Sequence, residues 1–349
     1  MDRSRSVIAI PPGETIKEQL IDRGMSQKEF AVRMDMTEKH ISKLVNGEVQ
    51  LTPDVSVRLE TVLGVPAKFW NNLEASYREK LVKVKNENEM EADLEISKRL
   101  PYAEMAKFGW VPETRNPQER VERLRRYFEI VKLYLLDNHQ ISKIACRRLA
   151  ITEKSDLAVL AWAQEARIES RKIETSKFDR AKLMNAISEI RKMTTKKPEF
   201  FCEKLVELLA ECGVALVFLP HLKGSYLQGA SFLDGNHVVI GMTLRGKDSD
   251  KFWFSLFHEL GHIMLNHLVE EGTREEDEIA ADEWASEALI RSVDMDLFVR
   301  QGVYTPSSIK EFAQSLDIAP GIVVGRLQYL GKIGYDRLNT LKEKYIFEV

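Results

Sequence analysis

The sequence predicts a mainly α-helical protein with a small β-sheet. Apolar residues recur at helical spacing through most of the first two hundred positions, whereas short β-type runs gather between residues 215 and 242. The length of 349 residues, with 44% hydrophobic and 30% charged side chains, is typical of a folded chain of two or three domains. We expect a five-helix N-terminal domain at residues 1–80, a helical middle region at 81–198 and a C-terminal α+β domain at 199–349.

Composition excludes several classes of protein. The net charge of −3 excludes a cationic binder such as a histone-like protein, although a local basic patch stays possible. The sequence lacks a run of 18 apolar residues and the apolar core of a secretory signal, so we expect no membrane segment and a cytoplasmic location. Cys146, Cys202 and Cys212 lack CxxC spacing and are expected to be free thiols.

Two short helices near the N-terminus are predicted from their capping residues. Ser26 precedes the first, with Glu29 three residues later, and Thr37 precedes a second helix that ends before Gly47. Two short helices joined by about three residues form the helix-turn-helix pattern. With Ile41 and Leu44 turned inward, the second helix presents a polar outer face.

This outer face has the chemistry of a DNA major-groove reader. Lysines neutralise phosphates or reach guanine edges, and hydroxyl or amide side chains hydrogen-bond to bases or phosphates. On pattern alone, a helical bundle with a solvated face remains an equal alternative. The candidate contacts to double-stranded DNA are Gln27, Thr37, Glu38, Lys39, His40, Ser42 and Lys43.

Several short segments of residues 11–80 form a recognisable set: Pro12-Gly13-Glu14, Ser26-Gln27, Ile41-Ser42, Asn46-Gly47, Leu51-Thr52-Pro53, Phe69-Trp70 and Asn72-Leu73. In these segments, residues 11–80 resemble the Xre-type DNA-binding domain of the HigA family of antitoxins. The resemblance implies a homodimer bound to operator DNA, autoregulation of a toxin–antitoxin operon, and a cognate toxin as protein partner.

The middle region shows helices but no recognisable chemistry. Residues 83–98 are strongly charged and are expected to form a solvated helix or linker. Asn116 and Pro117 form a helix start, followed by an apolar stripe that extends to Leu135, and another helix is expected to begin near Ser155. We interpret this region as a helical spacer.

The C-terminal region alternates between strand and helix patterns. An amphipathic helix is expected at 201–211, followed by strands at 215–219, 228–233 and 237–242, the last two joined by a glycine-containing turn. Helical patterns then cover 252–267 and about 276–292.

The first of these two helices carries an HExxH motif. His258 and His262 are four residues apart, so they share one helical face about 5–6 Å apart and can chelate one ion. Glu259 adjoins the first histidine and is the candidate general base. Chance occurrence in a chain this long is on the order of one in a hundred, so two ordinary core histidines are the weaker interpretation.

A third ligand is expected from the next helix. Glu278 and Asp282 are again four residues apart; we assign Glu278 to the ion and Asp282 to hold one histidine in its correct tautomer. Glu275 is the alternative ligand. Two imidazoles and a carboxylate suit one Zn²⁺ ion.

This half of the chain resembles the ImmA/IrrE family of zinc metallopeptidases. The resemblance rests on residues 213–218, 252–267 and 278–285, and residues 172–179 are similar to long HigA-type regulators that end in such a domain. It implies a thermolysin-like arrangement in which His258, His262 and Glu278 hold zinc. Ala280 and Arg291 depart from the family pattern without removing a ligand, and an oxyanion stabiliser is not identifiable among Tyr226, His237 and His267.

Together these patterns predict a DNA-binding regulator, of the antitoxin type, fused to a zinc-dependent endopeptidase-like domain. The substrate would be a cognate toxin, another repressor or the chain's own 83–98 segment. The strand before the metal helix is the expected place for an extended peptide to bind by strand addition. Two alternatives stay open. In the first, the metal domain is a non-catalytic sensor or toxin-binding module. In the second, the chain is a stand-alone peptidase whose N-terminal bundle binds other proteins and not DNA.

Overall fold

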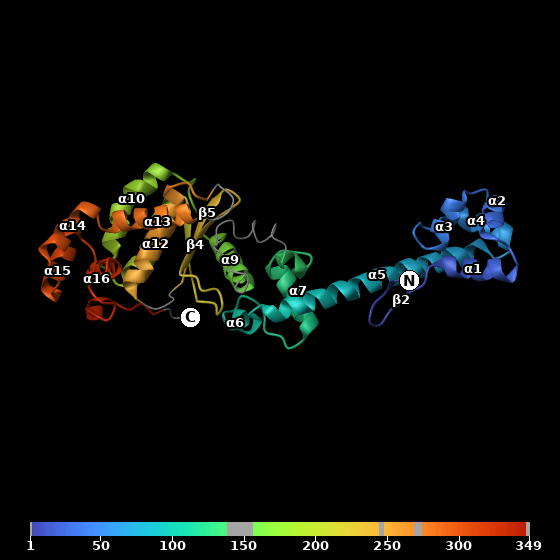
Figure 1. Cartoon of the computed structure of the whole chain (residues 1–349), viewed down its shortest axis with the longest axis horizontal. Helices are drawn as coiled ribbons and strands as arrows, with labels where there is room; N and C mark the ends of the chain where they lie inside the picture. The colour runs from blue at the N-terminus through green and yellow to red at the C-terminus, as the bar shows by residue number, and fades with distance from the viewer. Residues whose placement is uncertain (1, 138–155, 244–247, 269–273, 347–349) are drawn as a thin grey trace. The chain divides into compact units, whose positions relative to one another are not determined.

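The computed structural model describes residues 2–137, 156–243, 248–268 and 274–346. Cys146 and the helix start expected at Ser155 lie outside the described residues. The chain forms helices with one small three-stranded sheet, which confirms the predicted fold class. It divides into two compact units, residues 1–95 and 96–349 (Figure 1). Helix α5 passes through residue 80 without a break, and the domain boundaries at 80 and 198 stay a prediction.

The first unit is a helical bundle with an N-terminal hairpin. The helices are α1 (Pro12–Asp22), α2 (Gln27–Arg33), α3 (Glu38–Val45), α4 (Pro53–Leu63) and α5 (Ala67–Arg99). Their apolar faces meet around Phe30, Ile41 and Trp70, which are fully buried. Gly13 lets α1 approach α3, since a Cβ there would lie 1.8 Å from the carbonyl oxygen of Val45.

The hairpin, which the sequence did not predict, pairs β1 (Asp2–Arg3) with β2 (Ile8–Ala9). It packs on α5, where Ser4 Oγ donates to Glu87 at 2.6 Å and Ser6 Oγ donates to the other oxygen of Glu87 at 2.5 Å. Ala9 is buried against Tyr77 and Val84 of the same helix. The hairpin therefore covers an apolar flank of α5 within the first unit.

The second unit begins with helices that precede the sheet. These are α6 (Tyr102–Lys107), α7 (Pro117–Tyr127), the 3₁₀ turn η1 (Leu133–Asp137), α9 (Asp156–Ser170), α10 (Arg180–Met193) and α11 (Pro198–Glu211). Asn116 caps α7 as predicted, accepting hydrogen bonds from the amides of Gln118 and Glu119. The helix ends at Tyr127 rather than continuing to residue 135, because Glu129 adopts a left-handed conformation and Val131 is exposed.

The sheet has the order β3-β5-β4, formed by β3 (Val214–Leu219), β4 (Gly229–Asp234) and β5 (His237–Thr243). β5 runs parallel to β3 and antiparallel to β4, so the predicted hairpin is confirmed. Successive β5 side chains face opposite sides. Ile240 and Met242 enter the main core, while Gly241 lies beneath Trp162 of α9. α9 therefore covers one face of the sheet and α12 the other (Figure 1).

The remaining helices pack around that core. They are α12 (Ser249–Met264), α13 (Glu275–Leu289), α14 (Ser292–Gln301), α15 (Pro306–Ser315), α16 (Pro320–Tyr329) and the 3₁₀ turn η2 (Asn339–Leu341). α12 stops at Met264, three residues before the predicted end. Asn266 is left-handed, and the His267 amide bonds back to the His262 carbonyl, which closes the helix. α13 ends at Leu289 because Ile290 is extended.

Candidate metal centre and DNA-binding helix

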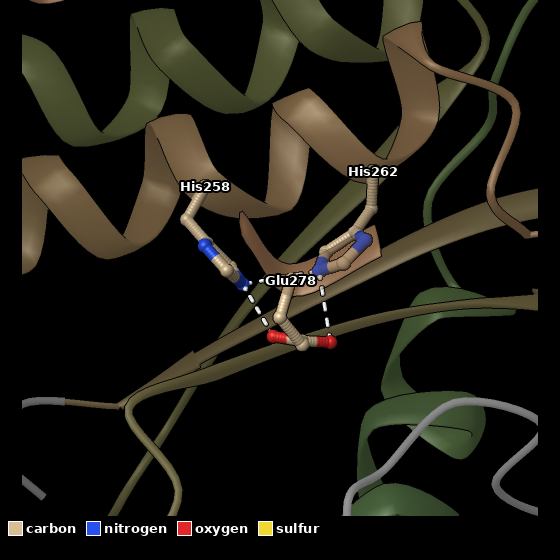
Figure 2. Close-up of side chains that lie close together, drawn as sticks. All are labelled: His258, His262 and Glu278. Carbon is tan, nitrogen blue, oxygen red and sulfur yellow. Dashed lines mark hydrogen bonds and ion pairs between the residues drawn. The ribbon is translucent and has the colours of Figure 1, made fainter. Parts of the chain in front are cut away.

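Two imidazole rings project from the same face of α12. The Nε2 atoms of His258 and His262 lie 3.0 Å apart, and both rings point toward Glu278 (Figure 2). The helix forms because its apolar residues, including Leu256 and Leu260, pack fully into the core. The spacing of the HExxH motif therefore places both nitrogens at one point.

Glu278 reaches this point from α13. Its two carboxylate oxygens lie 3.2 Å from His258 Nε2 and 3.5 Å from His262 Nε2. The two helices can pack this closely because residue 261 is glycine, where a Cβ would lie 3.1 Å from the carbonyl oxygen of Ala281. Among the described residues these three side chains are the group able to share one ion.

The donor spacing fits a tetrahedral zinc ion. Zinc binds nitrogen and oxygen ligands at about 2.0–2.2 Å, which places neighbouring donors of a tetrahedron roughly 3.3 Å apart. The three donor separations, 3.0, 3.2 and 3.5 Å, bracket that value. Two nitrogens and one carboxylate leave a fourth position for water or substrate.

The charge distribution also favours a cation at this point. Burial by itself would lower the pKa of His258, but hydrogen bonds to Asp282 and Glu278 outweigh it and raise that pKa to about 10. Hydrogen bonds to the two histidines lower the pKa of Glu278 to about 2. The carboxylate is thus strongly ionised, and positive charge between the rings is stabilised.

Asp282 contacts the far side of the first imidazole. Its Oδ1 lies 2.7 Å from His258 Nδ1, which is the placement expected from the sequence. Glu275, the alternative ligand, is exposed on the first turn of α13 and lies outside the group of three. The ligand roles themselves stay a prediction.

Glu259 is buried beside the edge strand β4. Ser231 Oγ donates to its Oε2 at 2.6 Å, and Gly229 leaves room for the carboxylate, since a Cβ there would come within 3.3 Å of Glu259. Burial raises the pKa of Glu259, while the charge of His258 and the Ser231 hydrogen bond oppose that effect. The sequence did not predict a role for Ser231, because it lies 28 positions before Glu259, in a strand that carries no recognisable motif.

Of the three oxyanion candidates, His267 contacts a side chain of the candidate metal centre. Its Nδ1 is 3.1 Å from Nδ1 of His262, and its Nε2 is 3.4 Å from Asp277 Oδ1. Tyr226 is 66% exposed, and His237 is exposed at the start of β5. The contact of His267 is with the back of a ligand ring, a role the sequence did not indicate.

The predicted helix-turn-helix forms in the first unit. Ser26 Oγ accepts from the Glu29 amide at 3.1 Å, and Thr37 Oγ1 accepts from the His40 amide at 3.2 Å, so both predicted caps are present. Ile41 and Leu44 are buried as expected. Ser42 is half-buried, and the other candidate contacts are exposed: Gln27, Thr37, Glu38, Lys39, His40 and Lys43.

Comparison with known proteins identifies the first unit. Residues 16–70 match the helix-turn-helix family model. An uncharacterized HTH-type transcriptional regulator of Escherichia coli (strain K12), YddM, is 33% identical over 66 residues, which cover 19% of this chain and 70% of that protein. The chain belongs to the helix-turn-helix transcriptional regulators. This confirms the Xre-type resemblance and supports DNA binding.

The regulator carries a second domain of known type. Residues 216–327 match the IrrE N-terminal-like domain, a peptidase-like domain. The match extends from β3 to α16 and includes the three converging side chains, which confirms the ImmA/IrrE resemblance. Within the part of the regulator that the structure describes, no helix is long and apolar enough to cross a membrane.

Proposed function

We propose that the regulator binds operator DNA as a homodimer and that its C-terminal domain is a zinc-dependent endopeptidase acting on a protein partner. The observation that carries the second half is the convergence of His258, His262 and Glu278 with the buried carboxyl of Glu259 beside them. Desolvated carboxyls next to a cationic centre are suited to proton transfer.

The proposed chemistry is hydrolysis of an amide. A zinc ion held by the two histidines and Glu278 would act as a Lewis acid on the scissile carbonyl. Glu259 accepts a proton from the attacking water and returns it to the leaving nitrogen, so no proton is gained or lost overall. Ser231 holds the Glu259 carboxyl in place through its 2.6 Å hydrogen bond.

The edge strand offers a place for an extended substrate. The strand before the metal helix, β5, is paired on both sides, so the expectation that a peptide adds there is wrong. Within the described residues β4 pairs with β5 alone, which leaves its other edge for an added strand. Ser231 lies in this strand and touches Glu259. A peptide paired along β4 would therefore pass the general base.

For the DNA half, we propose that α3 enters the major groove. Lys39 and Lys43 would contact phosphates or guanine edges, and Gln27, Ser42 and His40 would approach bases or phosphates. The exposure of the two lysines, Gln27 and His40, together with the helix-turn-helix family match, supports this arrangement. An antitoxin role with a cognate toxin as partner is the setting we favour.

The substrate we favour is a partner protein rather than the 83–98 segment of the chain itself. That segment is helical within α5. A helix keeps its amides bonded internally, so strand-like binding there would first require local unwinding. A toxin or another repressor with an accessible extended segment avoids this cost.

A Glu259→Gln variant tests catalysis against the non-catalytic alternative. It removes the base but keeps every proposed ligand. If catalysis is needed, the variant retains zinc and DNA binding but no longer releases fragments of the partner or relieves its effect. If it neutralises the partner and represses as well as the parent, the domain is a sensor or binding module.

DNase footprinting upstream of the coding region tests whether the first unit binds DNA or only docks proteins.

A further inference from the structure

A cavity of about 540 Å³ lies against the faces of α12 and α13 that carry the candidate metal ligands. Along α12, Phe254 is four residues before His258 and so stands one turn away on the same face. Along α13, Asp282 and Ser286 follow Glu278 at the same spacing. Phe254, Asp282 and Ser286 all line the cavity, which therefore begins about one helical turn from the candidate ligands.

The walls of this cavity are mostly apolar. Leu289 and Ile290 at the end of α13 and Ile322 of α16 are buried lining residues, and Phe254 is half-buried. Tyr329, which is 69% exposed, stands at the rim. A volume of this size holds at least one large side chain together with nearby main chain.

The charged groups that line the cavity are of both signs: Lys251, Arg326, Lys342 and Lys344, with Asp248, Asp250 and Asp282. Arg326 Nη1 donates to Ser286 Oγ at 2.6 Å, while the buried Nε of Arg326 has no hydrogen-bond partner among the described residues. Lys342 is bound to Asp250 at 2.6 Å in a buried ion pair. A main-chain carbonyl that enters the cavity would find a donor in Arg326.

We infer that this cavity is the specificity pocket of the proposed peptidase and receives a large apolar side chain from a residue flanking the bond that is cut. The inference rests on the proposed metal centre, because Asp282 is both a wall of the cavity and the partner of His258. The substrate class is a protein segment with Leu, Ile, Met or Phe at that position.

Amino-acid hydroxamates test the pocket separately from catalysis. Their two oxygens bind a metal while the side chain samples the space beside it. On the zinc-loaded, full-length Glu259→Gln protein, leucine and phenylalanine hydroxamates should bind about tenfold or more tightly than glycine hydroxamate, as expected for burial of a large apolar side chain.

Two substitutions should remove this selectivity. Phe254→Ala and Tyr329→Ala should each lower the leucine-to-glycine affinity ratio to about threefold or less, with zinc content and glycine hydroxamate binding unchanged. Phe200→Ala is the matched control, since Phe200 is 73% exposed on α11 and lies outside the cavity. If Phe254→Ala fails to fold, Tyr329→Ala alone tests the pocket.

The outcomes separate the two proposals. Equal binding of leucine and glycine hydroxamates overturns the pocket, whether or not peptides are cut. Selective binding by a protein that cuts nothing in a mixture of proteome-derived peptides supports the pocket and overturns the proposed peptidase activity. Cleavage sites enriched in large apolar residues at one flanking position support both, and failure to bind zinc overturns both.

Discussion

His262 Nδ1 lies 3.1 Å from His267 Nδ1, and His267 Nε2 lies 3.4 Å from Asp277 Oδ1. If His262 offers its Nε2 to a metal, its hydrogen must sit on Nδ1 and point to His267. His267 then accepts at Nδ1 and keeps its own hydrogen on Nε2, facing Asp277. One consistent set of tautomers therefore links the ligand ring to a carboxylate, as Asp282 does directly for His258.

Replacing His267 should weaken metal binding. His267→Phe keeps a ring of similar size but removes the acceptor for His262 Nδ1, so we expect zinc affinity to fall by about 10- to 100-fold. Competition with a chromogenic chelator measures this change. His237→Phe, an exposed histidine on β5, is the control. Unchanged affinity in His267→Phe would show that the ring contact does not orient the ligand.

Ser231→Ala should reduce hydrolysis without loss of metal. The substitution removes the donor to Glu259 Oε2 but touches none of the three proposed ligands. We expect the turnover rate to fall by about tenfold because the carboxylate is less firmly held. Peptide release at saturating substrate, together with elemental analysis, measures both quantities. Ser225→Ala, another buried serine, should leave the rate as in the parent, and an equal loss there would point to general destabilisation.

Removal of two lysines from α3 should weaken DNA binding. Lys39→Ala/Lys43→Ala deletes two exposed positive charges from the face expected in the groove. We expect weaker operator binding and a salt-dependence slope smaller by about 2, since each phosphate contact releases about one counterion. Fluorescence anisotropy across salt concentrations measures both. Lys192→Ala/Lys204→Ala removes the same charge from the other unit, and an identical effect there would refute a specific role for α3.

Glu165 should make stability depend on pH. Burial raises its pKa from 4.5 to about 7, the charge of Glu169 adds to this, and a hydrogen bond from Tyr127 opposes it. The folded state therefore holds a proton that the unfolded state releases, so stability falls as the pH rises from about 4.5 to about 7. The total loss is at most about 3 kcal/mol.

Glu165→Gln should remove this dependence. The variant should match the parent at pH 5 and exceed its stability at pH 8, as measured by urea unfolding. Glu174→Gln, at an exposed position, should follow the parent at both values. A parent protein more stable at pH 8 than at pH 5, with no change in Glu165→Gln, would contradict the assigned cause.

The sequence predicted what depends on short spacing. The pair His258 and His262 shares a face because four residues make about one helical turn, and the caps Ser26 and Thr37 act on amides three residues away. Ser231 and His267 were missed in their observed roles. The first reaches Glu259 only because β4 lies beside α12, and the second only because α12 ends at a left-handed Asn266.

The spacing of apolar residues in the sequence likewise could not predict the cavity. Ile322 and Arg326 belong to α16, more than sixty residues after His258, and only the packing of α16 against α12 brings them to the same space. The hairpin at residues 2–9 was missed because strands of two residues are too short to show alternation.

The contact between that hairpin and α5 affects how the DNA-binding half should be isolated. A fragment that begins at residue 16, where the family match starts, and continues through α5 would lose Ser4, Ser6 and Ala9. Tyr77 and Val84 would then face water, and Glu87 would lose both hydroxyl donors. Such a fragment would expose apolar surface and be prone to self-association, so an oligomeric state measured on it would describe the exposed flank rather than the native regulator.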